Sequence, residues 1–394
     1  MEYGLIGKTL GHSFSKPIHE ALGGYPYELK ELPCEAAARA FFAARSFRAV
    51  NVTIPYKALA LEACDEVSEE ARAIGAVNTL AGKTVLILGT GATQRTVRAV
   101  CAAEGAAQVL CASRSEKSGA LRYEQAAARQ DVNVIVNASP AGMYPDNGTC
   151  LVDLAAPGAF PALEAVFDVV YNPLRTRLVQ MAGARGVPCA GGLLMLVAQA
   201  KYAAELFLGA PIEERRILEI YRDLLAEKAG LALVGMPSCG KTGVGKALAK
   251  ALKKPFVDAD AELVRRAGRP ISEILRPGNE EPFRRLEAAV TADLAKRGGA
   301  VLATGGGVVL REENVRALRQ NYVVLYLDRP LALLKPGGGR PLSATREALA
   351  GQLAVRRPLY EAACHARVEN AGSFEAAVAA AKEAFYEVLD CEWA

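Results

Sequence analysis

Two short apolar segments of the sequence each run into a glycine-rich turn and then into a helical pattern. The first covers residues 85–88 and is followed by Gly89-Thr90-Gly91; the second covers residues 231–234 and is followed by Gly235 and Gly240-Lys241-Thr242. A strand, a tight glycine turn and a helix in this order open a parallel α/β sheet and aim backbone N–H groups at phosphate. Two such openings predict two nucleotide-binding sheets.

The chain has 394 residues, which is more than one hydrophobic core usually serves. Residues 211–228 carry apolar side chains at helical spacing, and we predict that they form the closing helix of the first half. Ala229-Gly230 then forms the junction. We predict three domains, which cover residues 1–80, 81–228 and 229–394.

Composition excludes several classes of protein. The net charge of +4 is too small and too scattered for a nucleic-acid binder, and no apolar run approaches the ~20 residues that cross a bilayer. Nine cysteines without a CxxC pair indicate reduced thiols rather than a disulfide framework or a zinc site. We therefore expect a cytoplasmic α/β enzyme, or a pair of enzymes, with small-molecule partners and neither nucleic-acid nor membrane partners.

The second glycine turn fits the phosphate-loop pattern G-x-x-x-x-G-K-[ST], from Gly235 to Thr242. In this pattern the glycines let the backbone curl around a β-phosphate. Lys241 offers a positive charge to the β- and γ-phosphates, and Thr242 offers an oxygen to Mg²⁺. The apolar strand before the motif and the helix after it favour this interpretation over a chance turn.

Five side chains further along suit a small kinase. Asp258 and Asp260 end a short apolar segment, where Asp258 can hold Mg²⁺ through water and Asp260 can orient a substrate hydroxyl. Arg284 and Arg356 suit capture of a carboxylate, and Arg340 lies in a glycine-hinged stretch that suits a lid over ATP. A substrate with hydroxyls and a carboxylate meets all these demands, although another small polyol or a nucleotide stays an alternative.

The motifs Phe283-Arg284-x-x-Glu287, Gly305-Gly306-Gly307 and Arg356-Arg357-Pro358-Leu359-Tyr360 complete the set, and residues 229–394 resemble shikimate kinase. The resemblance implies ATP and Mg²⁺ as cofactors, catalytic roles for Lys241, Asp260 and Arg340, and a lid at Arg340. Its shikimate-binding residues fall on Asp260, Arg284, Gly306 and Arg356. Its phosphate loop falls on Ser238, Cys239, Gly240, Lys241, Thr242 and Gly243. Gly243 stands where the family usually has a hydroxyl residue.

The first half gives weaker signals. Lys57 ends a short strand and acts as a proton donor or acceptor if burial lowers its pKa; otherwise it is a solvated lysine. The turn at Gly89 matches only part of the dinucleotide fingerprint, because Gln94 stands where the third glycine belongs. The next strand lacks an acidic residue at its end, and Arg114 and Lys117 suit a 2′-phosphate, so NADP is favoured over NAD.

Most of residues 1–228 resemble shikimate dehydrogenase. The resemblance rests on the motifs Gly11-His12-Ser13-Phe14-Ser15, Asn51-Val52-Thr53-x-Pro55-x-Lys57, Gly75-Ala76-Val77-Asn78-Thr79, Asn137-Ala138-Ser139-Pro140-x-Gly142-Met143 and Gly192-x-x-Met195-Leu196-x-x-Gln199. It implies a two-lobed dehydrogenase with a Rossmann-like sheet and Lys57 as the acid/base residue. Shikimate contacts then fall on Ser13, Ser15, Thr53, Lys57, Asn78, Tyr171 and Gln199. NADP contacts fall on Gly89, Thr90, Gly91, Ala92, Thr93, Ser113, Arg114, Ser115, Lys117 and Gly192.

One segment of the dehydrogenase family has no counterpart here. In the family, several tens of residues with an N-T-D motif separate G-A-V-N-T from the dinucleotide strand, and the aspartate pairs with the catalytic lysine. Here Leu80 runs directly into residues 81–83 and the strand at Thr84. We expect a bifunctional enzyme whose NADP-dependent interconversion of 3-dehydroshikimate and shikimate is strongly impaired. The alternative is an active kinase fused to a degenerate dehydrogenase that only binds ligand or stabilises the fold.

Overall fold

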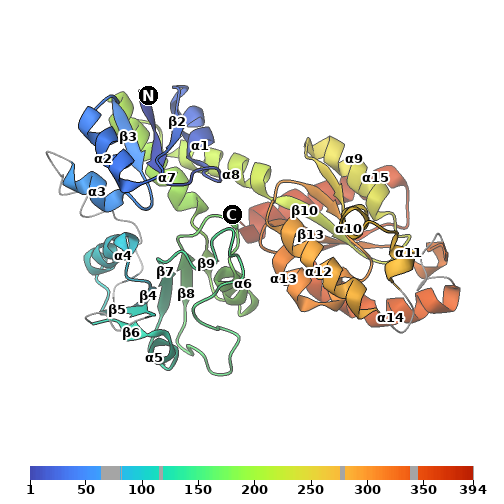
Figure 1. Cartoon of the computed structure of the whole chain (residues 1–394). Coiled ribbons are helices and arrows are strands. Elements are labelled where there is room, and N and C mark those ends of the chain that lie inside the picture. The colour runs from blue at the N-terminus through green and yellow to red at the C-terminus, as the bar shows by residue number, and fades with distance from the viewer. Residues whose placement is uncertain (64–79, 81, 115–118, 276–279, 338–344, 394) are drawn as a thin grey trace. The chain divides into compact units, whose positions relative to one another are not determined.

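The computed structural model describes residues 1–63, 80, 82–114, 119–275, 280–337 and 345–393. The chain divides into two compact units (Figure 1). The first unit comprises Met1–Asn172 and Thr176–Asp223, and the second comprises Pro173–Arg175 and Leu224–Ala394. Four predicted site residues lie outside the described residues: Asn78, Ser115, Lys117 and Arg340.

The first unit begins with a small parallel sheet of order β2-β1-β3. Its strands are β1 (Tyr3–Gly7), β2 (Glu28–Glu31) and β3 (Ala49–Val52), and the central strand is buried throughout. The helices that connect them are α1 (Ser15–Gly23) and α2 (Glu35–Ala44), and α3 (Lys57–Glu62) follows β3. The later helix α7 (Leu193–Leu208) packs against α1.

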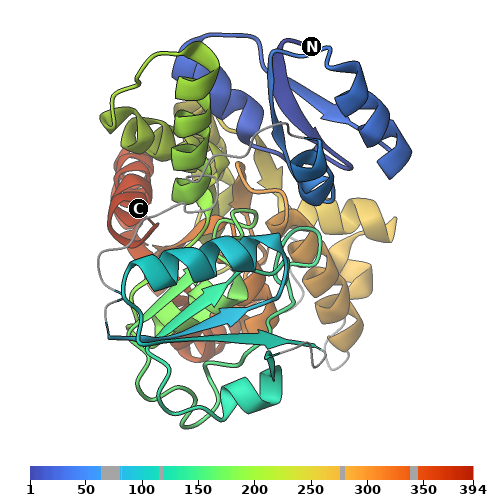
Figure 2. The same ribbon diagram turned by 90° about the vertical axis from the view of Figure 1, so that its left-hand side faces the viewer.

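The second sheet of this unit is parallel, with strand order β6-β5-β4-β7-β8-β9. Its strands are β4 (Thr84–Leu88), β5 (Gln108–Ser113), β6 (Leu121–Arg122), β7 (Val134–Asn137), β8 (Ala165–Asp168) and β9 (Cys189–Ala190). The helices α4 (Ala92–Ala103), α5 (Tyr123–Ala127) and α6 (Arg177–Ala184) lie between strands, and Figure 2 shows α4 across one face of the sheet. The order reverses at β4, as in doubly wound dinucleotide-binding sheets, so the expected Rossmann-like sheet is confirmed.

The second unit is built on a five-stranded parallel sheet of order β11-β12-β10-β13-β14. Its strands are β10 (Gly230–Val234), β11 (Phe256–Asp258), β12 (Val301–Ala303), β13 (Tyr322–Asp328) and β14 (Ala366–Glu369). Its principal helices are α9 (Lys241–Leu252), α10 (Ala259–Ala267), α11 (Ile271–Ile274), α12 (Glu281–Ala295), α13 (Glu312–Leu318), α14 (Arg346–Ala363) and α15 (Phe374–Val388). Every residue of β10 is buried, as expected for a central strand covered on both faces. The α/β fold class is confirmed.

Helix α8 (Arg215–Lys228) begins later than the predicted helix over residues 211–228. The backbone N–H of Ile212 donates to the Glu205 carboxylate, and Glu214 pairs with the buried ammonium of Lys201 at 2.5 Å. These contacts with α7 hold residues 211–214 outside the helix. The division between the two units falls within α8, whereas the predicted boundaries after residues 80 and 228 stay predictions.

The last turn of α8 is anchored in the second unit. Leu224 and Leu225 are buried, and the Lys254 ammonium donates to the carbonyls of Ala226 and Glu227 at 2.8 Å each. Cations at a helix C-terminus stabilise its unpaired carbonyls. Burial lowers the pKa of Lys254 to about 8. Within the described residues, no helix combines the length and apolar character that crossing a membrane requires.

His365 makes the stability of the second unit depend on pH. Burial and the charge of Arg319 lower its pKa to about 3, and its Nδ1 accepts the backbone N–H of Val324 at 2.9 Å. Between pH 6.5 and 4 the unfolded chain binds a proton at this residue and the folded chain does not, so stability falls as pH falls. We expect His365→Gln to abolish about 3 kcal/mol of this loss. Urea unfolding of both proteins at a series of pH values measures the difference; equal pH dependence contradicts it.

Candidate active site

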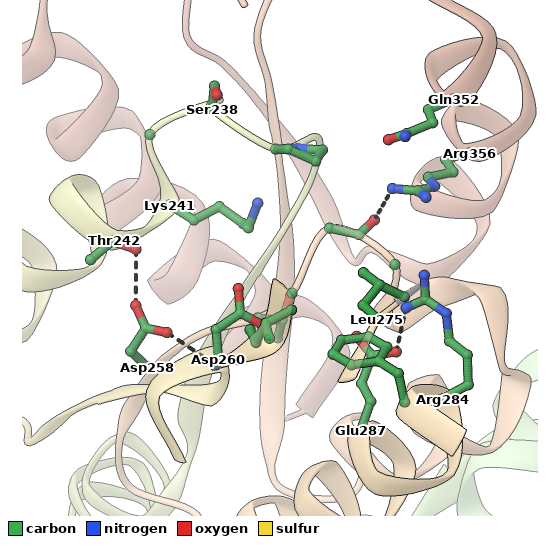
Figure 3. Close-up of a pocket in the computed structure, with 18 of the residues that line it drawn as sticks. Ser238, Lys241, Thr242, Asp258, Asp260, Leu275, Arg284, Glu287, Gln352 and Arg356 are labelled. Carbon is green, nitrogen blue, oxygen red and sulfur yellow. Dashed lines mark hydrogen bonds and ion pairs between the residues drawn. The ribbon is translucent and has the colours of Figure 1, made fainter. Parts of the chain in front are cut away.

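The phosphate loop of the second unit connects β10 to α9 (Figure 3). Three of its residues have left-handed backbone conformations: Gly235 (φ 144°), Ser238 (φ 66°) and Gly240 (φ 100°). A Cβ at Gly235 would lie 2.6 Å from the carbonyl oxygen of Leu327, so glycine is required there. The loop thus ends at the N-terminus of a twelve-residue helix, a favourable place for an anion.

Lys241 and Thr242 open α9 at the end of this loop. The ammonium of Lys241 is buried and donates to the carbonyls of Gly235 and Met236 at 2.9 Å each. The hydroxyl of Thr242 donates to Asp258 Oδ2 at 3.0 Å. The other oxygen of Asp258 accepts the backbone N–H groups of Asp260 and Ala261, which fixes the carboxylate at the start of α10.

The contacts of Asp258 also decide in which element Asp260 lies. The sequence places Asp260 at the end of a strand, but β11 stops at Asp258 and Asp260 lies in the first turn of α10. The reason is the Asp258 cap, which starts the helix one residue after the strand. Mg²⁺ commonly uses one or two protein oxygens and completes its shell with phosphate and water. Thr242 and Asp258 fit that pattern, and no cluster of three or more metal-ligating side chains occurs among the described residues.

A cavity of about 430 Å³ lies beside the phosphate loop. It gathers side chains from α9, α10, α12, α14 and the triple-glycine turn, and Figure 3 shows Lys241, Thr242 and Asp260 opposite Arg284, Arg356 and Gln352. The predicted kinase residues that line it are Ser238, Gly240, Lys241, Thr242, Gly243, Asp258, Asp260, Arg284, Gly306 and Arg356. Cys239 does not line it and is fully buried.

The two cavity arginines differ in their charge environment. Arg284 is buried and forms a 2.6 Å ion pair with Glu287, one turn further along α12. Arg356 is also buried, but its Nη1 donates to the carbonyl of Gly306 at 3.2 Å and, among the described residues, it forms no ion pair. The hydroxyl of Tyr360 donates to the same carbonyl. Among the described residues, Arg356 is thus the cavity arginine without an ion pair, as Lys241 is the cation of the phosphate loop without one.

Glu287 is a cavity residue to which the sequence analysis assigned no role. Burial raises its pKa, as does the nearby Asp260, while Arg284 and Arg356 act in the opposite direction. A Cβ at Gly305 would lie 2.9 Å from oxygens of both Asp260 and Glu287, so glycine lets the two carboxylates approach. The spacing of Arg284 and Glu287 on one helix face was the available signal. Gln352, Thr304 and Phe283 also line the cavity and were not predicted.

A substitution at Gly243 tests whether stability and ATP binding depend on the residue type at this position of the phosphate loop. Its φ is not left-handed, and a Cβ there would meet Phe374 at 3.5 Å, an ordinary contact. We expect Gly243→Ala to raise the free energy of unfolding by about 0.5–1 kcal/mol, because alanine loses less backbone entropy in a helix. The KM for ATP should stay within about threefold, since the backbone N–H remains. Chemical unfolding and steady-state kinetics measure both; a destabilised variant contradicts the expectation.

The first unit brings some of the predicted dehydrogenase residues together. The side chains of Ser13 and Tyr171 are hydrogen-bonded, and burial raises the pKa of Tyr171. The backbone N–H of Ser15 donates to the Ser13 hydroxyl at 3.2 Å. Thr53 follows β3, and Gln199 is an exposed residue of α7.

Lys57 is the first residue of α3 rather than the end of a strand. It is exposed, yet enough protein surrounds its ammonium for desolvation to lower its pKa. In the part of the chain that the structure describes, Lys57 forms no ion pair. This agrees with the missing aspartate partner.

The predicted dinucleotide residues lie at the carboxyl ends of β4 and β5. Gly89 has φ 111°, and its N–H donates to the carbonyl of Ala112 at 2.8 Å. Thr90 and Gly91 form the loop before α4, and Ala92 and Thr93 lie in the first turn of this helix. Ser113 ends β5, and Arg114 follows it. Gly192 precedes α7, where a Cβ would lie 2.1 Å from the carbonyl oxygen of Val169.

Comparison with known proteins identifies the second unit. The shikimate kinase family model matches residues 237–389. A shikimate kinase from Symbiobacterium thermophilum is 43% identical over 148 residues, which cover 35% of this chain and 84% of the relative. The chain belongs to the shikimate kinase family. Its kinase region accounts for the phosphate loop and the cavity beside it.

A second match precedes the kinase region. The model of the shikimate dehydrogenase substrate binding domain matches residues 5–80. A shikimate dehydrogenase (NADP(+)) from Clostridium perfringens is 26% identical over 273 residues, covering 56% of this chain and 97% of the relative. A solved chorismate mutase/shikimate 5-dehydrogenase fusion protein from Clostridium acetobutylicum has 28% identity and a TM-score of 0.50, covering 56% of this chain and 96% of that one. The expected fusion of a shikimate dehydrogenase region with a shikimate kinase is confirmed.

Proposed function

We propose that the second unit transfers the γ-phosphoryl group of ATP to the 3-hydroxyl of shikimate. The observation that carries this proposal is the single cavity lined by Lys241, Asp260 and Arg356, beside a phosphate loop. Shikimate has hydroxyl groups for Asp260 and one carboxylate for Arg356. The 84% coverage of a 43% identical shikimate kinase supports the same substrate.

In the proposed mechanism, each side chain acts on a defined group. Asp260 accepts a hydrogen bond from the attacking hydroxyl, orients it and takes its proton. Lys241 exchanges the carbonyls of Gly235 and Met236 for the β- and γ-phosphate oxygens. Thr242 and Asp258 would hold Mg²⁺, which would supply positive charge to neutralise the phosphates. Arg284, Gly306 and Arg356 hold shikimate, and the lid role of Arg340 stays a prediction.

The test is phosphorylation of shikimate by the purified chain with ATP and Mg²⁺. We expect Asp260→Ala and Arg284→Ala to abolish use of shikimate. If either variant still phosphorylates an acceptor at the rate of the unmodified chain, the alternative of another polyol or nucleotide substrate is favoured instead.

We propose that the first unit binds shikimate and NADP, with Lys57 as the acid/base residue. The hydrogen-bonded side chains of Ser13 and Tyr171 support binding of shikimate, and the glycine turn at Gly89 supports binding of NADP. Among the described residues Lys57 has no carboxylate partner, and this supports impaired turnover, because a misplacement of about 1 Å can cost ~10²-fold in rate. A degenerate module that binds without turnover is the second candidate, and the same observation favours it.

NADP-dependent oxidation of shikimate by the purified chain separates the two candidates. We expect a kcat at least about 10²-fold below that of ordinary dehydrogenases. Turnover at the ordinary rate contradicts impairment, while NADP binding without any turnover identifies the degenerate module. Binding is measured by the change in NADPH fluorescence.

We propose a cytoplasmic enzyme with small-molecule partners and neither nucleic-acid nor membrane partners. The eight cysteines that the structure describes are all free thiols, which suits a reducing compartment. Cell fractionation tests this placement.

A further inference from the structure

The cavity of the second unit has four uncharged polar side chains among its described lining residues: Ser238, Thr242, Thr304 and Gln352. Three of them donate their hydroxyls to protein groups. Ser238 donates to the carbonyl of Lys335 at 2.8 Å, Thr242 to Asp258 at 3.0 Å, and Thr304 to the carbonyl of Leu233 at 2.9 Å. The fourth, Gln352, comes from α14, outside the phosphate loop and the sheet.

Gln352 lies four residues before Arg356 in α14, so both side chains share one helix face. Figure 3 shows its amide group beside the guanidinium of Arg356, on the side of the cavity opposite Lys241. An amide has two N–H donors and one acceptor oxygen, so a protein partner for one of these groups leaves others for a ligand.

The charges of the cavity indicate which ligand group comes to this place. Glu287 neutralises Arg284 at 2.6 Å, whereas Arg356 has no ion pair among the described residues. A buried cation without a counter-ion is costly, and an anionic ligand group relieves that cost. One nitrogen of Arg356 is already engaged by Gly306. One edge of a guanidinium presents two parallel N–H groups to a carboxylate, so a carboxylate bound there keeps lone pairs for a further donor.

We propose that Gln352 is a further substrate-binding residue, whose amide N–H donates to the carboxylate that Arg356 holds. This inference rests on the proposed function of the second unit. Because the amide is neutral, it adds a donor without competing with the carboxylate for the charge of Arg356. Gln352 thereby strengthens binding of the acid group, for which the charge of Arg356 selects.

Two variants at this position test the proposal in the full-length chain. Gln352→Glu keeps the shape and places a negative charge where the carboxylate binds, so the KM for shikimate should rise about 10²-fold. Gln352→Met removes only the hydrogen bond and should raise that KM about 5- to 10-fold. The KM for ATP should change less than about twofold in both. Val355→Glu is the matched control, because it adds the same charge to α14 at a residue 63% exposed to solvent.

The carboxamide of shikimate separates a contact with the acid group from a general effect. With this neutral acceptor, the penalty of Gln352→Glu relative to wild type should fall to about threefold or less. The proposal is overturned if both variants keep the wild-type KM for shikimate, if the carboxamide suffers the same penalty, or if the penalty falls on ATP.

Calorimetric binding of shikimate without ATP keeps the two proposals apart. A wild-type chain that binds shikimate but does not phosphorylate it defeats the proposed function, while the affinities of the variants still test Gln352. A wild-type chain that does not bind shikimate defeats both. Thermal unfolding of each variant shows that the compared proteins are folded.

Discussion

Asp260→Asn should lower the kcat for shikimate phosphorylation by about 10²- to 10⁴-fold, the range for loss of a general base. The asparagine oxygen still accepts a hydrogen bond from the hydroxyl but cannot take its proton. The KM for ATP should stay within about threefold, because the Thr242–Asp258 contact and the Lys241 contacts do not involve the Asp260 side chain. A coupled assay of ADP release, with each substrate varied in turn, gives these constants.

Asp293→Asn is the matched control for this variant. Asp293 is an exposed carboxylate of α12 that pairs with Arg266 at 2.6 Å and does not line the cavity. The kcat of the Asp293→Asn variant should remain within about twofold of wild type. A fall in kcat that is equal in the two variants, or a normal kcat for Asp260→Asn, contradicts the assigned role of Asp260.

Arg356→Met should separate substrate binding from stability. Loss of the cation that receives the carboxylate should raise the KM for shikimate by about 10²-fold or more. The ligand-free protein should keep its free energy of unfolding or gain up to about 2 kcal/mol, because a buried charge without a counter-ion is removed. The carbonyl of Gly306 retains the Tyr360 hydroxyl as a donor. Steady-state kinetics and urea unfolding without ligand measure the two effects.

Arg357→Met removes the same type of side chain from the next position of α14. Arg357 is partly exposed and lies 3.6 Å from Asp328, which keeps a 2.6 Å ion pair with Arg367. We expect its KM for shikimate to stay within about twofold of wild type. If Arg356→Met strongly destabilises the protein while Arg357→Met does not, Arg356 is a structural residue and its assignment to the carboxylate is wrong.

The sequence predicts best what depends on local chain geometry. The phosphate loop, with Lys241 and Thr242 at the start of a helix, follows from glycine positions and an apolar strand. Residue placement at element ends was less predictable, since Asp260 and Lys57 both lie in helices rather than at strand ends. In the first case a single capping carboxylate, Asp258, decides where the helix begins.

Charge pairing in the cavity could not be predicted from residue types. Arg284 and Arg356 look alike in the sequence, yet Arg284 forms an ion pair with Glu287, whereas Arg356 forms none among the described residues. The difference depends on which carboxylate reaches which guanidinium once α12 and α14 are packed. Gln352 was missed because its relevance comes only from the neighbouring Arg356 and the cavity that both line.

The anchoring of α8 by Lys254 has a practical consequence for dissecting this polypeptide. A recombinant kinase fragment cut at Ala229 would lack the two carbonyls that accept from the Lys254 ammonium, and it would also lack the buried side chains of Leu224 and Leu225. A kinase fragment intended to fold alone should therefore begin upstream of Leu224, so that it keeps the last turn of α8.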